Sequence, residues 1–121
     1  MNATGFRRIA LGLDEAIESA HMGHPDFRVH GKIFASLRAD NRHGTVKLTP
    51  DEQQRLLDEH PDAFTPASGA WGRQGWTTVQ LDAIDEETLG EALTLAWRLA
   101  ASARPAKRRK AAAKAPRRSR R

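Results

Sequence analysis

The sequence predicts a two-layer α+β domain, in which an antiparallel sheet packs against three helices, followed by a basic tail that is disordered in isolation. Three observations lead to this prediction. Apolar and polar residues alternate in several short segments, apolar residues recur at helical spacing in three others, and the composition changes abruptly at residue 104. The chain has 121 residues, the size of one small domain, which excludes a multidomain enzyme.

The first part of the chain predicts one helix and then two or three antiparallel strands. Apolar residues recur at helical spacing over residues 6–13. Alternation runs through residues 24–30 and 32–38 and returns in residues 45–48. Between the last two segments, residues 40–44 (Asp-Asn-Arg-His-Gly) have the composition of a tight turn.

The next part predicts a second helix and a further strand. Thr49 and Glu52 have the spacing of a capping box, which marks the start of a helix that ends before Pro61. A glycine-rich segment, residues 68–75, then leads to residues 76–81, which alternate as a strand does.

A final helix and the end of the domain follow. Asp85 is suited to cap a helix because its carboxylate can accept hydrogen bonds from free backbone N–H groups. The apolar stripe of this helix consists of Leu89, Leu93, Ala96, Trp97 and Ala100. Pro105 ends the ordered part, so we expect residues 1–103 to form the domain.

Charge is divided unevenly between this domain and the residues after it. The chain has 20 Lys and Arg against 15 Asp and Glu, a formal net charge of +5. Ten of the basic residues and none of the acidic ones lie in residues 104–121, so residues 1–103 have a net charge of −5. Residues 104–121, the basic tail, have no large apolar side chain to bury, and we expect them to be disordered.

Composition also disfavours several function classes. The chain has no cysteine, which excludes disulfides, thiolate metal sites and a cysteine nucleophile. We see no signal peptide and no apolar run that could span a bilayer, so we expect a cytoplasmic protein without a membrane partner. No catalytic arrangement of serine, histidine and carboxylate is recognisable, so we expect no enzyme activity. His21 and His24 are close in sequence, but we expect ordinary polar roles for them and no metal or other cofactor.

Two tryptophans and an arginine, Trp71, Arg73 and Trp76, lie together near the glycines of residues 68–75. Exposed indole and guanidinium groups can stack on nucleic-acid bases. In a small domain, however, large aromatic side chains more commonly build the core. We therefore expect Trp71 and Trp76 to be core residues, and we leave both a binding and a structural role open for Arg73.

Four segments together resemble a known family: residues 23–29, 31–35, 46–48 and 69–77, the last of which contains Trp-Gly-Arg-Gln-Gly-Trp. In this order and spacing they resemble the MmcQ/YjbR-like family of small bacterial proteins, over residues 6–101. The resemblance implies an α+β domain related to CyaY-like and secretion-chaperone-like folds, with about five strands in the order α-β3-α-β2-α. The family is usually described as DNA-binding through its similarity to a double-wing domain, and the resemblance implies no catalytic residues.

These observations favour a non-enzymatic, DNA-associated protein. We expect the basic tail to supply most of the affinity by contacting phosphates without sequence preference, while the domain positions it. In the domain, Arg28, Lys32 and Arg73 are predicted to contribute to the DNA-binding surface. The predicted contacts in the tail are Lys107, Arg108, Arg109, Lys110, Lys114, Arg117, Arg118, Arg120 and Arg121.

The alternative is a protein-interaction or small-ligand adaptor that uses a cleft near Trp71, Arg73 and Trp76, with the tail incidental. The net negative domain favours this alternative, and the tail favours DNA. The distribution of charge on the folded surface discriminates between them, because a continuous basic stripe supports DNA binding and cations scattered among carboxylates support the adaptor. The stripe would consist of Arg28, Lys32, Arg38, Arg42, Lys47 and Arg73.

Overall fold

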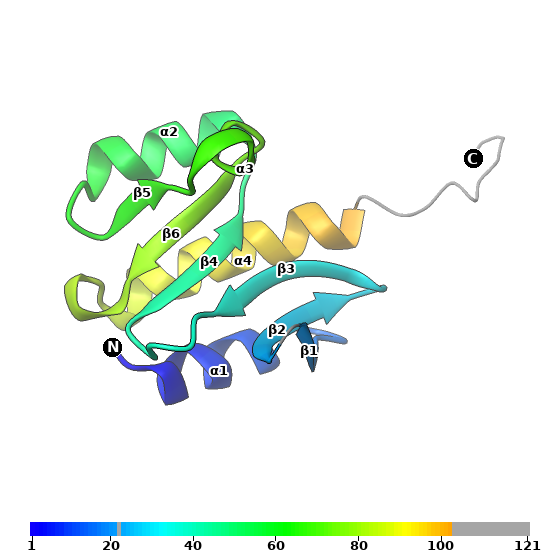
Figure 1. The fold of residues 1–121 in the computed structure, drawn as a ribbon. Helices are drawn as coiled ribbons and strands as arrows, with labels where there is room; N and C mark the ends of the chain where they lie inside the picture. The colour runs from blue at the N-terminus through cyan, green and yellow to red at the C-terminus, as the bar shows by residue number, and fades with distance from the viewer. Residues whose placement is uncertain (22, 103–121) are drawn as a thin grey trace, which may run out of the picture.

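The computed structural model describes residues 1–21 and 23–102, which form one sheet with helices packed on it (Figure 1). The helices are α1 (Ala3–Leu11), α2 (Pro50–Glu59), α3 (Gly69–Arg73) and α4 (Glu86–Ser102), with a 3-10 turn, η1 (Leu81–Ala83). The strands are β1 (Ile17–His21), β2 (His24–Val29), β3 (Lys32–Leu37), β4 (His43–Lys47), β5 (Phe64–Pro66) and β6 (Trp76–Gln80). The predicted α+β class and the three predicted helices are confirmed.

All six strands belong to one antiparallel sheet, in the order β1-β2-β3-β4-β6-β5. The sequence predicted about five strands, and β1 is the one it missed. β1 (Ile-Glu-Ser-Ala-His) has few strand-forming residues, and it forms because it pairs along its length with β2, from Ile17 opposite Arg28 to His21 opposite His24. β5 and β6 are the two strands that the family resemblance implied after the second helix.

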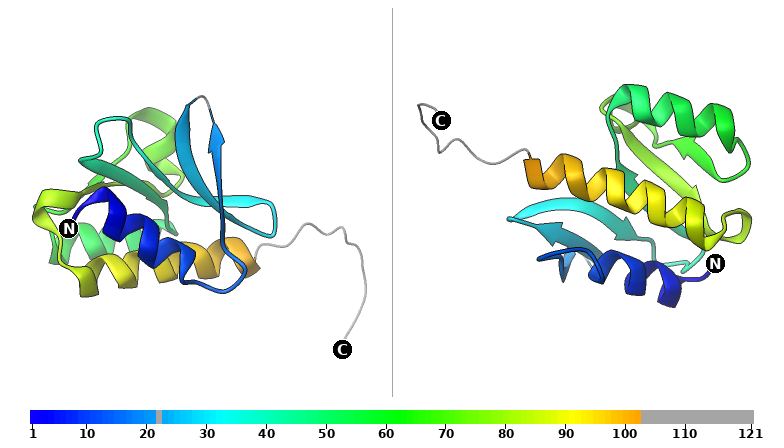
Figure 2. Two further views of the ribbon diagram at one scale, coloured as in Figure 1. Left: turned by 90° about the horizontal axis from the view of Figure 1, so that it is seen from below. Right: turned by 180° about the vertical axis from the view of Figure 1, so that it is seen from behind.

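α1, α2 and α4 lie on the same face of the sheet (Figure 2). α4 packs across β2, β3 and β4, and α1 packs against α4 and β4. The core lies between these two layers, and it holds all four phenylalanines, Phe6, Phe27, Phe34 and Phe64, at no more than 1% exposure. Burial of each such side chain contributes about 1.5–3 kcal/mol to the free energy of unfolding.

An irregularity in β3 adds an extra residue to this core. Phe27 of β2 pairs with Ala35, whereas the next residue, Arg28, pairs with Ile33. Phe34 is therefore an additional residue on β3, as in a β-bulge, and Phe34 and Ala35 are both fully buried. Strict alternation along the strand would have placed these two neighbours on opposite faces of the sheet.

The predicted helix starts are confirmed. Thr49 Oγ1 accepts a hydrogen bond from the Glu52 backbone N–H at 3.1 Å, and Glu52 Oε1 accepts one from the Thr49 N–H at 3.0 Å. Before α4, Asp85 Oδ1 accepts a hydrogen bond from the Thr88 N–H at 2.7 Å, and hydrogen bonding to Thr88 lowers the pKa of Asp85 below its usual value. These contacts satisfy N–H groups that have no partner within the helix.

The basic tail and the predicted domain end at residue 103 lie outside the described residues. In the part of the chain that the structure describes, no helix is both long enough and apolar enough to cross a membrane.

A chain ending at residue 103 is expected to unfold in a single cooperative thermal transition, because all the core residues lie between Phe6 and Ala100. Circular dichroism during heating measures this transition, with and without a chelator. We expect the same midpoint in both conditions. A shortened chain without a transition would show that the tail is needed for folding, and a loss caused by the chelator would reveal a metal-dependent fold.

Candidate binding groove

A groove of about 670 Å³ lies on the face of the sheet opposite α1, α2 and α4. Side chains of β2, β3 and β4 form the floor of the groove. Residues 67–76, which include α3, form its wall, and we call this segment the wall below. The floor residues alternate with core residues such as Phe27 and Val46, so they point away from the helices. The lining residues used below are Asp26, Ile33, Ser36, Arg38, Asp40, Thr45, Trp71 and Trp76.

A glutamine from α2 hydrogen-bonds to the wall and fixes its position. Gln53 is only 9% exposed, and its Nε2 lies 3.1 Å from three acceptors: the carbonyl oxygens of Gly72 and Trp76 and the hydroxyl of Thr77. The buried Thr77 hydroxyl in turn donates to the Gly75 carbonyl at 2.9 Å. A single side chain therefore connects α2 to both α3 and the start of β6.

Two glycines allow the backbone of the wall to pack closely. A Cβ atom on Gly72 would collide with the carbonyl oxygen of Ala67, and one on Gly75 would collide with that of Leu48. Gly75 also has φ +106°, a conformation that other residues rarely adopt. Both positions require glycine, which explains the spacing of the two glycines between the tryptophans.

Trp71 and Trp76 flank these glycines and present their rings to the groove. Their ring centroids are 6.5 Å apart with an interplanar angle of 74°, an edge-to-face arrangement. Trp71 is 63% exposed, so the expectation that it is a core residue was wrong, and Trp76 is only half-buried. The reason is that the wall, which includes α3, stands on the face opposite α1, α2 and α4, so none of these three helices packs over the rings.

An ion pair occupies one part of the groove floor. Asp26 is 2% exposed, and its two carboxylate oxygens accept hydrogen bonds from Arg28 Nε at 2.9 Å and Nη2 at 3.1 Å. The hydrogen bond to Asp26 raises the pKa of Arg28 above its usual value. The charge of Arg28, a predicted DNA contact, is therefore balanced by a neighbouring carboxylate.

The remaining cations of the predicted basic stripe do not all share the groove face. Lys32 pairs with the core residue Val29, so its register position is on the helix side. Arg73 is exposed at the end of α3 but does not line the groove. Arg38 lines the groove, and Lys47 Nζ lies 5.9 Å from the centroid of the Trp76 ring.

Asp40 lies at the rim of the groove, and its carboxylate hydrogen-bonds to residues of the turn that contains it. The Arg42 and His43 backbone N–H groups and His43 Nδ1 all lie within hydrogen-bonding distance of its carboxylate, at 2.8, 3.1 and 2.7 Å. The hydrogen bond from the Arg42 N–H contributes most to lowering the pKa of Asp40, to about 2. The carboxylate therefore remains ionised at neutral pH and is already engaged by its own turn.

The family model for YjbR matches residues 11–99 of this chain. The chain belongs to the YjbR family. A crystal structure of the Deinococcus radiodurans protein DR2400, with the family-model domain DUF419, has a similar fold. The TM-score is 0.66 at 24% sequence identity, over 77% of this chain and 73% of that chain. No curated protein matches the chain.

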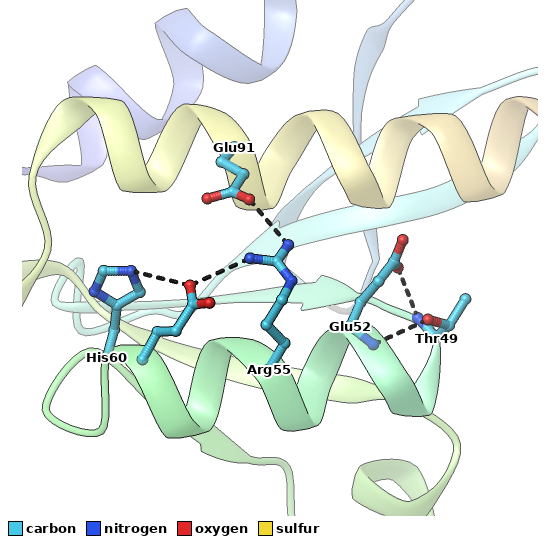
Figure 3. Close-up of polar contacts among 6 residues, drawn as sticks. Thr49, Glu52, Arg55, His60 and Glu91 are labelled. Atoms are coloured by element: carbon cyan, nitrogen blue, oxygen red, sulfur yellow. Dashed lines mark hydrogen bonds and ion pairs between the residues drawn. The ribbon is translucent and has the colours of Figure 1, made fainter.

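In this YjbR domain, most carboxylates lie away from the groove. Among the described residues, Asp26 and Asp40 are the only acidic residues that line it. Figure 3 shows part of the opposite side, where Arg55 of α2 contacts Glu59 at 3.2 Å and Glu91 of α4 at 2.9 Å. The other acidic residues likewise lie on the helices, on β1 or in the connecting turns.

No metal site is evident in the described part of the YjbR domain, where no three histidine or acidic side chains gather to hold an ion. His24 lines the groove, and His30 Nε2 lies 2.9 Å from Glu15 Oε1. His24 and His30 therefore lie at different places on the domain, one in the groove and one beside Glu15.

Sequence analysis of the YjbR domain missed Gln53 and Thr77, on which the wall depends. One signal was available for Gln53, which lies three residues before the buried Leu56 and so on the same side of α2. A polar side chain at such a position indicates a buried hydrogen-bonding role. Its partners lie 19 to 24 residues away in the chain, and no local pattern identifies them.

Replacement of Gln53 by alanine is expected to lower the free energy of unfolding by about 2–3 kcal/mol, because buried acceptors of the wall lose their donor. The neighbouring Gln54→Ala is a matched control, since Gln54 is exposed and its side chain hydrogen-bonds to the exposed Asp58, and its effect should stay within about 0.5 kcal/mol. Urea denaturation of both variants measures the difference. Equal effects would show that the Gln53 contacts contribute nothing specific.

Replacement of Trp71 by alanine is expected to lower the free energy of unfolding by about 1 kcal/mol or less, since this side chain loses mainly its contact with Trp76. Phe34→Ala, which empties a core position, should cost about 3–5 kcal/mol. The same denaturation measurements compare the two variants. A cost for Trp71→Ala as large as that for Phe34→Ala would mean that Trp71 is a core residue after all.

Proposed function

We propose that this YjbR protein is a non-enzymatic, DNA-associated protein that binds mainly to the phosphate backbone, with little sequence preference. The observation behind the proposal is the division of charge: ten basic and no acidic residues in 104–121, against a net charge of −5 in residues 1–103. A dense cluster of cations releases condensed counterions when it meets DNA, and this release drives binding. A DNA partner also implies a cytoplasmic location.

The predicted basic stripe is only partly present, because Arg28 is paired with Asp26 and Lys32 lies on the helix side, so the domain supports this proposal through fewer cations than expected. Arg38 and Lys47 belong to the groove side, whereas most of the carboxylates lie elsewhere. A polyanion approaching the groove side therefore meets less repulsion than the net charge of the domain suggests. In this proposal, the tail supplies affinity and the groove side determines how the domain faces the DNA.

The proposal includes no catalysis. Within the described residues, the hydroxyls of the groove floor, on Ser36 and Thr45, hydrogen-bond to each other, and no histidine or carboxylate is their partner. The buried carboxylate beside them, Asp26, is paired with Arg28. A nucleophile needs an adjacent base that can accept its proton, and among the described residues neither hydroxyl is hydrogen-bonded to one.

A second candidate function is an adaptor for a protein or small ligand. The exposed Trp71 beside a groove of about 670 Å³ favours it, since this volume is in the range of ligand pockets. In that case the basic tail plays no part in recognition.

The two candidates predict different binding by the full chain and by a chain ending at residue 103. If about half of the tail cations contact phosphates at once, the logarithm of the DNA association constant should fall against the logarithm of salt concentration with a slope on the order of −4 to −5. The shortened chain should lose most of this slope and most of its affinity at physiological salt. Fluorescence anisotropy with two unrelated duplexes over a salt series measures both quantities.

Undiminished affinity in the shortened chain would contradict the role of the tail. A strong preference between the two duplexes would contradict phosphate-driven binding, because a phosphate contact carries no direct base information. No binding by either chain would favour the adaptor.

A further inference from the structure

We propose that the groove is a binding site for unpaired DNA bases, with Trp71 as the stacking platform and Arg38 and Lys47 as the nearby phosphate contacts. This inference rests on the proposed function, and it assigns the domain a substrate class, single-stranded DNA, that the tail alone cannot distinguish.

The aromatic wall has the properties that base stacking requires. Trp71 is 63% exposed, while its edge-to-face contact with Trp76 holds it in place. Below it, the Gln53 hydrogen bonds and the close packing of Gly72 fix the backbone of α3. A ring that is exposed but already packs against a neighbour loses less side-chain entropy than a free ring when a flat ligand covers it.

The charges around the wall suit a phosphate backbone better than an apolar partner. Lys47 Nζ is 5.9 Å from the Trp76 centroid, and Arg38 Nη2, just after β3, lies 3.4 Å from Thr78 Oγ1 on β6, two strands away. Among the described residues, no carboxylate oxygen forms an ion pair with either cation. Asp26 and Asp40, the acidic groups of the groove, are engaged by Arg28 and by the turn at Arg42 and His43.

Unpaired rather than paired bases fit this arrangement. In a duplex, neighbouring base pairs cover the flat faces of each base, whereas a single strand can turn a base toward an aromatic ring. The groove volume of about 670 Å³ is that of a small-ligand site, so it accepts a few nucleotides and leaves the rest of a strand outside.

A protein partner fits the same surface less well. The exposed large apolar side chains of the described residues are Leu11, Ile17 and Trp71, and they lie on three separate elements, α1, β1 and α3. A specific protein interface buries about 800 Å² on each partner around a central apolar cluster. The floor beside Trp71 mixes apolar side chains such as Ile33 with the Ser36 and Thr45 hydroxyls, so it offers only part of such a cluster.

The proposal also has the tail and the groove act on one strand, and the tail follows Ser102 at the end of α4. Ser102, at the end of α4, and His30, beside the β2–β3 turn, line the same small pocket, and β3 continues from that turn into the groove floor. The 19 residues that follow Ser102 can span up to about 60 Å when extended. In this proposal, tail cations contact phosphates of the same strand whose base is held at Trp71.

The test uses the full chain and three 12-unit probes: oligothymidylate, an abasic strand with the same number of phosphates, and a duplex. Anisotropy titrations at physiological salt give the affinity for each probe. We expect oligothymidylate to bind about tenfold more tightly than the abasic strand, a difference in the range of one stacked base. Trp71→Ala should remove most of this difference and leave duplex affinity within about twofold. Trp71→Phe, which keeps an aromatic face, should restore part of it.

Matched controls separate stacking and local charge from general effects. Leu11→Ala removes another exposed apolar side chain, and Arg98→Ala removes another exposed arginine, both away from the groove. Both should leave oligothymidylate affinity within about twofold, whereas Arg38→Ala should weaken the binding of both single strands by about two- to fivefold. Thermal unfolding of each variant establishes that it is folded.

The outcomes distinguish this inference from the function on which it rests. Equal affinity for oligothymidylate and the abasic strand, or no effect of Trp71→Ala on a folded chain that still binds duplex DNA, overturns the inference alone. No binding of any probe by the full chain overturns both. A change of oligomeric mass caused by Trp71→Ala, measured by light scattering, would show that a second copy covers the groove, and it also overturns the inference.

Discussion

The six-stranded sheet buries only one of its faces, because α1, α2 and α4 all pack on the same side. This arrangement gathers the four phenylalanines into one core and leaves side chains on the other face in contact with solvent. The packing is tight enough that Gly44 has no room for a Cβ atom beside the Phe6 ring. The groove exists because the second face is left uncovered.

The groove wall nevertheless depends on the covered side. Gln53 belongs to α2, yet it donates to the backbone of α3 and β6, and the glycines at positions 72 and 75 bring that backbone against Ala67 and Leu48. The family motif thus has two parts with different tasks. Its glycines allow close packing, and its tryptophans are left at the surface of the groove. A motif of glycines and aromatic residues can therefore build a binding surface even though the same residue types are common in cores.

Charge follows the same division between the two faces. Ion pairs such as that of Arg55 with Glu59 and Glu91 lie on the helix side, while the groove side keeps Arg38 and Lys47 beside the aromatic wall. The net charge of −5 in residues 1–103 consequently describes neither face well. The predicted continuous basic stripe is only partly present, because Lys32 belongs to the other side of the sheet and Arg28 is paired with Asp26. For a polyanion, the local arrangement matters more than the sum of charges.

The sequence alone determined the features that depend on residues close together in the chain. The Thr49–Glu52 capping box, the Asp85 cap, the three long helices, the strands β2, β3, β4 and β6 and the family motif were predicted correctly, because a few neighbouring residues make each of them. Only the tertiary structure decided which side chains are exposed. Trp71 is a residue type common in cores, and it is exposed because α1, α2 and α4 all pack on the other face of the sheet. Similarly, the partners of Gln53 lie up to 24 residues away, and the bulge that buries Phe34 depends on pairing with β2. Contacts between segments that are distant in sequence determine which side chains are buried. Local sequence patterns do not identify these contacts.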